Sequence, residues 1–240
     1  MNLRTLFVVF AMLVVAPVFA AENEEEEKDP LEGNVKLGYL ATSGNTETST
    51  LNTGFEASYT LDSWKHQASA AAIYSEENKV VTAEAYEAAW TSGWELTERD
   101  FLFGRLNWRK DRFGGFNTQF SQTAGYGRKI LVGKVHTLTA DVGAGARQSE
   151  DQLGVSTDEF IFTGGLGYKW QFSDTAELGQ TLAIEAGDSN TFSESVTSVS
   201  TTLIGAFRLV ASYTIRHNSD VPVGTEKKDT RTAISLQYDF

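Results

Sequence analysis

The protein has 240 residues, a formal net charge of −12 at pH 7 and no cysteine. The acidic balance argues against nucleic acid as a partner, because nucleic-acid binding needs a basic face. Without cysteine there are no disulfides, so an exported chain of this composition must be stabilised in another way. The length suits one large all-β domain.

Residues 1–20 are predicted to be a secretory signal peptide. Arg4 precedes an apolar run from Leu6 to Val18, and Val18-Phe19-Ala20 forms a cleavage site with a small final residue. A membrane anchor is the alternative, but the run is shorter than the roughly 18 apolar residues of a spanning helix.

Residues 21–32 are expected to form an acidic, disordered leader. The stretch ENEEEEKDPLE contains seven acids, one lysine and Pro30. Such a composition cannot bury enough apolar surface to fold on its own. A cation-binding tail is the sharper alternative, and a solvated leader is the simpler interpretation.

From Gly33 onward, apolar and other residues alternate with the period of a β-strand. Residues 33–240 are therefore predicted to form an antiparallel transmembrane β-barrel of twelve strands, closed by pairing of the first and last. The expected strands are Asn34–Thr42, Thr48–Leu61, Lys65–Tyr74, Val81–Leu96, Asp100–Lys110, Phe116–Ile130, His136–Gln148, Glu159–Phe172, Ala176–Ala186, Phe192–Leu203, Arg208–Asn218 and Asp229–Phe240.

The connections are expected to be short on one side of the barrel and mostly longer on the other. The short turns are Leu61–Ser63, Thr97–Arg99, Val132–Lys134, Ser173–Thr175 and Ile204–Ala206. The longer loops are Ser75–Val80, Asp111–Gly115, Ser149–Asp158 and Ser219–Lys228, with compact exceptions at Ser43–Thr46 and Gly187–Asn190. This asymmetry is typical of bacterial outer-membrane barrels and, with an even strand number, puts both termini in the periplasm.

Alternation alone does not say whether the apolar face meets lipid or a core, since a lipocalin-like soluble barrel has the same period. Here one face carries Leu, Ala, Val and Gly, with aromatic residues near the strand ends, whereas the other carries Gly, Thr, Asn and charges. Twelve strands also enclose more space than side chains can fill. Lipid on the apolar face is therefore predicted, although Glu84 and Gln122 fall on that face and indicate a bulge or an error there.

The opposite face is predicted to line a lumen. Ion pairs that pack across the lumen are one interpretation of its charged residues, and a selectivity ring is the other. The candidates, seven basic and five acidic, are Lys36, Glu56, Glu87, Arg105, Arg109, Asp141, Arg147, Glu159, Lys169, Glu185, Arg216 and Arg231.

No catalytic, cofactor-binding or metal site is predicted. His217 and Ser219 lie two residues apart, and this spacing resembles the His-x-Ser of outer-membrane phospholipase A, also a twelve-stranded barrel. However, His217 shares the lipid-facing parity of Tyr213 and Ile215, and Ser219 begins a loop. We expect a protein that is not an enzyme, and a lipid hydrolase is the third alternative.

The chain ends in SLQYDF, with apolar residues at alternate positions up to Phe240. A terminal aromatic residue of this kind resembles the signal that the barrel-assembly machinery recognises. Tyr238 and Phe240 are the expected assembly signal. The expected partners are therefore this machinery, outer-membrane lipid and lipopolysaccharide.

Three stretches together resemble the YdiY-like family of salt-induced outer membrane proteins, a domain of unknown function. They are Gly33–Tyr59, Asp111–Phe116 and His217–Phe240. The resemblance implies an outer-membrane barrel linked to osmotic or salt stress, and it supplies no catalytic residues.

The first functional hypothesis is a non-enzymatic protein of the bacterial outer membrane with a structural or salt-stress role. The alternative is a passive channel for small solutes with a weak preference for anions, because basic residues outnumber acids among the lumen candidates.

Overall fold

The computed structural model describes residues 30–42 and 47–240. The predicted signal peptide and residues 21–29 of the predicted leader lie outside the described residues, as does the expected turn Ser43–Thr46. Within the described residues, no helix is long and apolar enough to cross a membrane.

The prediction of twelve strands is confirmed. The first strand begins earlier than expected, because Leu31 and Glu32 pair with Tyr59 and Ser58. The last two residues of the predicted leader therefore belong to the barrel. The strands are β1 Leu31–Thr42, β2 Thr48–Leu61, β3 Trp64–Glu77, β4 Val80–Glu95, β5 Asp100–Asp111, β6 Phe116–Val132, β7 His136–Asp151, β8 Ser156–Gln171, β9 Ala176–Gly187, β10 Thr191–Ile204, β11 Phe207–Asn218 and β12 Lys228–Asp239.

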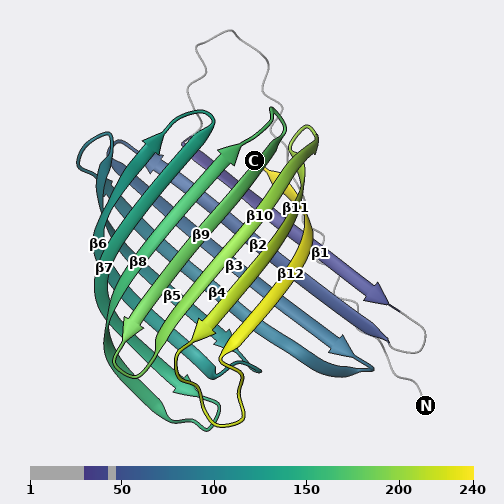
Figure 1. Cartoon of the computed structure of the whole chain (residues 1–240). Helices are drawn as coiled ribbons and strands as arrows, with labels where there is room; N and C mark the ends of the chain where they lie inside the picture. Colours follow the sequence, from purple (N-terminus) through teal and green to yellow (C-terminus); the bar gives the residue numbers. More distant parts are fainter. Residues whose placement is uncertain (1–29, 43–46) are drawn as a thin grey trace.

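The strands form one closed antiparallel barrel in which each pairs with its neighbours in sequence and β1 pairs with β12 (Figure 1). Main-chain bonds of 2.9 Å run in both directions between Gly33 and Phe240 and complete the closure. The C-terminus lies at the same end as the short turns, the upper end in Figure 1, and the β11–β12 loop lies at the other. We call these the short-turn end and the long-loop end.

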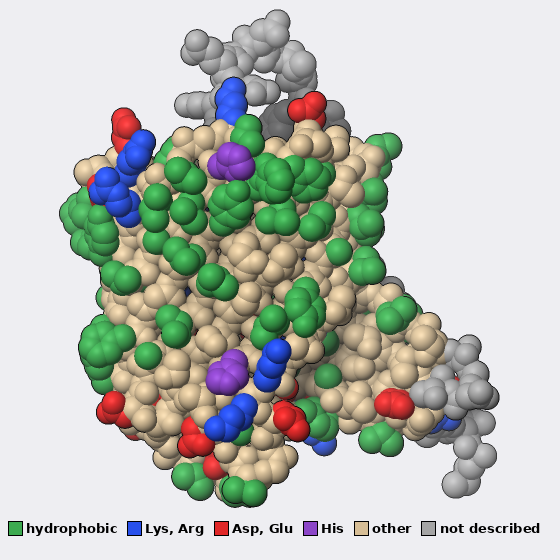
Figure 2. All heavy atoms as spheres, viewed as in Figure 1, with side chains coloured by type: hydrophobic (Ala, Val, Ile, Leu, Met, Phe, Trp, Pro, Cys, Tyr) green, Lys and Arg blue, Asp and Glu red, His purple; other side chains and the backbone are tan. Residues whose placement is uncertain are grey.

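The apolar face points outward, as predicted. The large hydrophobic side chains of alternate positions are exposed, whereas Arg147, Ser121 and Gln119 are buried inside. Figure 2 shows hydrophobic side chains across the outer face and most charged ones toward its two ends. This distribution is the reverse of a soluble barrel and is the one that a bilayer requires.

The short-turn end carries aromatic clusters on the outer surface. Trp64 stacks with Trp94 at 6.2 Å between ring centroids, and His136 stacks with Trp170 at 6.1 Å. Phe207 and Tyr238 form a third pair at 5.1 Å. Aromatic rings gather in this way at a membrane interface, because they combine an apolar body with a polar edge.

One connection at the long-loop end differs from expectation. The predicted loop Ser75–Val80 is a two-residue turn, because Asn78 and Lys79 both adopt positive φ, at 50° and 67°. This conformation matches the twist of the flanking strands, so β3 and β4 continue almost to each other. Loop length alone therefore distinguishes the two ends less sharply than the sequence suggested.

The two residues that conflicted with the predicted outer face do lie on it. Glu84 pairs in register with Tyr74, and Gln122 pairs with Leu106. A register shift lies beside Glu84, at Ser75–Glu76, and none is at Gln122. Arg112 reaches Glu84 at 3.0 Å, so a charge pair accounts for the acid on the outer surface.

Candidate functional site: the lumen

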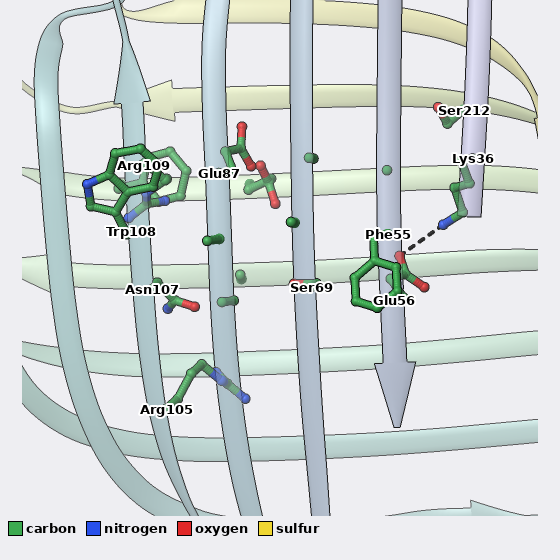
Figure 3. Close-up of a pocket in the computed structure, with 18 of the residues that line it drawn as sticks. Lys36, Phe55, Glu56, Ser69, Glu87, Arg105, Asn107, Trp108, Arg109 and Ser212 are labelled. Atoms are coloured by element: carbon green, nitrogen blue, oxygen red, sulfur yellow. Dashed lines mark hydrogen bonds and ion pairs between the residues drawn. The ribbon is translucent and has the colours of Figure 1, made fainter. Parts of the chain in front are cut away.

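A cavity of about 440 Å³ occupies the interior of the barrel. Every strand except β7 contributes lining residues, among them Asn52, Ser69, Thr163 and Ser212. Figure 3 shows Arg105, Asn107 and Arg109 side by side on β5, with Glu87 on the adjacent strand. Side chains two residues apart on a strand point to the same face. Arg105, Asn107 and Arg109 therefore all point into the lumen.

The strand registers place all of the predicted charged residues on the inner face. Glu87 pairs with Arg109, and Arg147 pairs with Glu159. The same face carries the buried Phe103 and Phe192, so it is the interior. Ten of the predicted residues form ion pairs, which fall into four groups.

The most buried group is centred on Arg147, whose side chain is 0% exposed. Its Nη2 donates to Glu159 Oε1 at 2.6 Å and also to the main-chain carbonyl of Asn190. Its Nη1 donates to Glu185 Oε2 at 3.4 Å. A guanidinium can satisfy several acceptors at once, which allows a full charge to be buried here.

Glu185 extends this group across the barrel. Its Oε2 also accepts from Arg109 Nη2 at 2.7 Å, and β6, β7 and β8 lie between the strands of these two residues. The guanidinium of Arg109 lies 4.0 Å from the ring centroid of Phe192 on β10. The aromatic face therefore supports the cation at its position in the lumen.

A second group joins opposite walls. Arg216 on β11 contacts Glu87 on β4 through two bonds of 2.6 and 2.8 Å, and four strands separate β11 from β4 on the shorter side. Arg216 Nε also donates to Glu194 on β10 at 2.6 Å. The two-pronged contact with Glu87 fixes the guanidinium in direction as well as in distance. This ion pair crosses the lumen.

Two further pairs are more exposed. Lys36 Nζ donates to Glu56 Oε1 at 2.9 Å, the contact marked by a dashed line in Figure 3. Arg105 lies 3.4 Å from Asp141 and 4.6 Å from the ring centroid of Phe103. Lys36 and Glu56 are the more exposed of these pairs, at 29% and 55%, so water weakens their attraction most.

Lys169 and Arg231 differ from the other predicted residues. Neither has an ion pair within 4.0 Å in the described part of the chain. Lys169 acts on Glu56 only through longer-range attraction. These two cations are the groups that the paired arrangement leaves available to a solute.

The sequence missed Glu194. Its strand, β10, reads TFSESVTSVSTTLI and has Ser or Thr on both faces, so alternation does not identify the inner one. Glu194 is the register partner of Arg216 on the adjacent strand β11. Pairing these two strands in the sequence would have placed this acid beside a predicted lumen arginine. The sequence also missed Arg208, which shares the inner face of β11 with Arg216 and bonds to Ser200. These two residues together leave the excess of basic over acidic lumen residues unchanged.

The hydrolase hypothesis finds no supporting geometry. His217 faces outward beside Ser193. The Ser219 hydroxyl accepts a bond from the Thr191 amide at 2.8 Å and faces Asn190 Oδ1 at 3.4 Å. A nucleophile needs a base within reach, and no bond joins His217 to Ser219 among the described residues.

The residues that the structure describes contain no group of three or more His, Cys, Asp or Glu side chains arranged to hold a metal ion. The lumen is therefore a site of paired charges, hydroxyls and amides. Such walls can hydrate or bind a polar solute.

The comparisons with known proteins agree with this architecture. The family described as "Protein of unknown function, DUF481" matches residues 35–240. The chain belongs to this family. It is also 33% identical over 218 residues to the uncharacterized protein YdiY of Escherichia coli strain K12, covering 88% of this chain and 84% of that one. The resemblance seen in the sequence is thus confirmed.

Solved structures share the fold at low sequence identity. An outer membrane channel from Pseudomonas putida F1 has a TM-score of 0.52 and 10% identity, covering 93% of this chain and 100% of that one. The KdgM porin has a TM-score of 0.48 and 9% identity, covering 87% and 99%. The match to the Pseudomonas putida channel shows that the DUF481 chain has the fold of an outer-membrane barrel.

Proposed function

We propose that this DUF481 protein is a passive channel for small polar solutes in the bacterial outer membrane, with its short turns and C-terminus in the periplasm. The observation that carries the proposal is the cavity of about 440 Å³ inside the barrel, lined by charged and hydroxyl-bearing side chains. A polar lining lowers the cost of moving a polar solute through the membrane.

The ion pairs set the expected size limit and selectivity of this channel. Arg216–Glu87 and Arg109–Glu185 occupy the lumen between facing walls, so only small solutes pass beside them. Most lumen charges are already matched, and Glu194 adds a further acid. We therefore expect weak charge selectivity, with any anion preference coming from Lys169, Arg208 and Arg231, which have no ion pair in the described part of the chain.

A structural role in the envelope under osmotic or salt stress is the second candidate. The observation that favours it is the same Arg216–Glu87 pair, because an ion pair between facing walls braces the barrel. In that case the charges serve packing, and no solute needs to pass. Both candidates are non-enzymatic, and the absence of an enzymatic activity stays a prediction.

Planar-bilayer recordings of Glu87→Gln separate the two candidates. The variant leaves Arg216 bonded to Glu194 on the neighbouring strand and removes the charge that draws it across the lumen. For a channel, we expect conductance steps from the wild-type protein and larger steps from the variant. Glu84→Gln is the matched control, since Glu84 lies three residues away on the same strand and faces outward. Absence of steps from both wild type and Glu87→Gln would exclude the channel.

A further inference from the structure

The seam between β1 and β12 is much shorter than the other contacts between strands. The register runs only from Asn34–Asp239 to Leu37–Leu236, whereas β1 pairs with β2 along all its length from Leu31 to Thr42. No pairing between β1 and β12 continues beyond Leu37 in the described residues. Figure 1 shows the two strands together near the C-terminus and far apart at the long-loop end.

The unpaired part of the seam lies at membrane depth. β12 has 12 residues, and a barrel strand needs about 9–11 residues to cross a bilayer. Only its last part, Leu236–Asp239, pairs with β1. The strands stay in contact one step further, because the Ile234 carbonyl lies against Gly38 and the Ser235 hydroxyl bonds to Asn52 on β2. Beyond this point, the described residues of β1 and β12 form no ladder with each other. Open sheet edges are not tolerated against hydrocarbon unless they are buried in protein or line a water-filled cavity, and the lumen cavity does reach this part of the seam.

Apolar side chains frame the opening on both faces of the sheet. Tyr39 is 68% exposed, Leu40 is 65% exposed and Ile234 is 65% exposed. Leu40 lies four residues after Lys36 on β1, so both side chains point to the same face of the strand. Because Lys36 lines the lumen, the exposed Leu40 also lies on the inner face. The lumen cavity itself reaches Lys36, Ala233 and Ser235 beside the seam. The polar interior and the apolar edge thus meet there.

A cation stands on the inner side of the same edge. Arg231 lies on the unpaired part of β12 and shares the inner face with Ala233 and Ser235. The described residues offer it neither an ion pair within 4.0 Å nor a hydrogen bond. An added anion would therefore be stabilised beside Arg231.

We propose that the seam is a lateral opening through which a lipid with an acidic headgroup enters from the bilayer, with its head near Arg231 and its acyl chain against the side chains of Tyr39, Leu40 and Ile234, while the unpaired main-chain groups stay hydrated from the lumen. The exposed apolar side chains at the seam would contact the acyl chain of the lipid, and Arg231 would pair with its acidic headgroup. The proposal does not depend on solute conduction, because a lipid can occupy the seam whether or not the lumen conducts.

Photolabelling from the membrane tests the opening. The probe is a palmitic acid analogue with a diazirine in its acyl chain, added to vesicles that contain the full-length protein. We expect labelling of the inward-facing Ala233 and Leu40, and none of Ala89 and Ala183, which face the lumen on β4 and β9. Equal labelling of Ala233 and Ala89 would overturn the proposal.

The headgroup is tested with Arg231→Gln and a hexadecanol analogue that carries the same diazirine. Loss of one interfacial cation weakens attraction of an anion about fivefold, so labelling by the acid should fall by about that factor. Labelling by the alcohol should not change. An equal fall with both probes would show that Arg231 supports the seam without recognising an acid, and would overturn that assignment.

Cysteine pairs give a second measurement that does not need a lipid, because the natural chain has no cysteine. Lys36→Cys with Gln237→Cys joins register partners in the paired seam and should form a disulfide under mild oxidation. Leu40→Cys with Ala233→Cys would be partners only if that register continued. We expect this pair to stay reduced, since a disulfide needs Cα atoms within about 7 Å. Equal oxidation of both pairs would mean a closed seam and would contradict the proposal.

Discussion

At the scale of single residues, Arg147 shows how a charge is accommodated inside this barrel. Its guanidinium is enclosed by Glu159, Glu185 and the Asn190 carbonyl, with no solvent exposure. Each acceptor comes from a different part of the wall, on β8, on β9 and in the β9–β10 turn. The group therefore ties three successive segments together from the inside.

Arg147→Ala should destabilise the folded barrel by about 3–5 kcal/mol, because it leaves the buried carboxylate of Glu159 without its arginine and leaves Glu185 with Arg109 alone. Unfolding by urea in lipid vesicles, followed by tryptophan fluorescence, measures the change. The control is Arg112→Ala, whose pair with Glu84 is largely solvent-exposed and should contribute less than about 1 kcal/mol. Equal effects of the two substitutions on the free energy of unfolding would contradict the stabilising role given to the buried ion pairs of Arg147.

At the scale of elements, closure depends on a few residues of β1 and β12. Phe240 bonds to Gly33 through both main-chain groups, and its ring lies against Gly33 so closely that a Cβ there would stand 2.5 Å from the ring. Glycine is needed at this point because any side chain would displace the ring. The last residue of the sequence thus has a structural contact in addition to its expected role in assembly.

Deletion of Phe240 should lower the amount of assembled barrel in the outer membrane several-fold and leave the activity of each assembled molecule unchanged. The deletion removes both the aromatic residue and the bonds to Gly33. Phe240→Tyr is the matched variant, since it keeps the ring and the main chain, and it should assemble normally. Heat-modifiable migration on gels reports the folded fraction. Normal levels of the deletion protein would count against an assembly signal.

The sequence predicted the elements well because β8, for example, has large apolar residues at alternate positions, with Gly164 as the one gap: Phe160, Phe162, Leu166, Tyr168 and Trp170. It could not predict pairing across the lumen. Arg216 and Glu87 are 129 residues apart, so their contact depends on the curvature of the closed barrel. It also missed the short seam, since β1 and β12 have the same alternation in their paired and unpaired parts.

At the scale of the whole molecule, the barrel separates two environments. Its outer surface is apolar with aromatic clusters at the short-turn end, and its interior is a network of charges around a cavity. This separation is what allows a chain that is 22% charged to span a bilayer. The same charges limit the free width of the lumen, so the proposed channel would pass small solutes only.

Swelling of vesicles tests the central claim most directly. Vesicles that contain the protein and trapped dextran are diluted into isotonic solutions of glycine, a monosaccharide or a trisaccharide, and light scattering reports solute entry. We predict rapid swelling in glycine, slower swelling in the monosaccharide and none in the trisaccharide, because ion pairs cross the lumen. No swelling in glycine, from protein that is shown to be folded, would contradict the account.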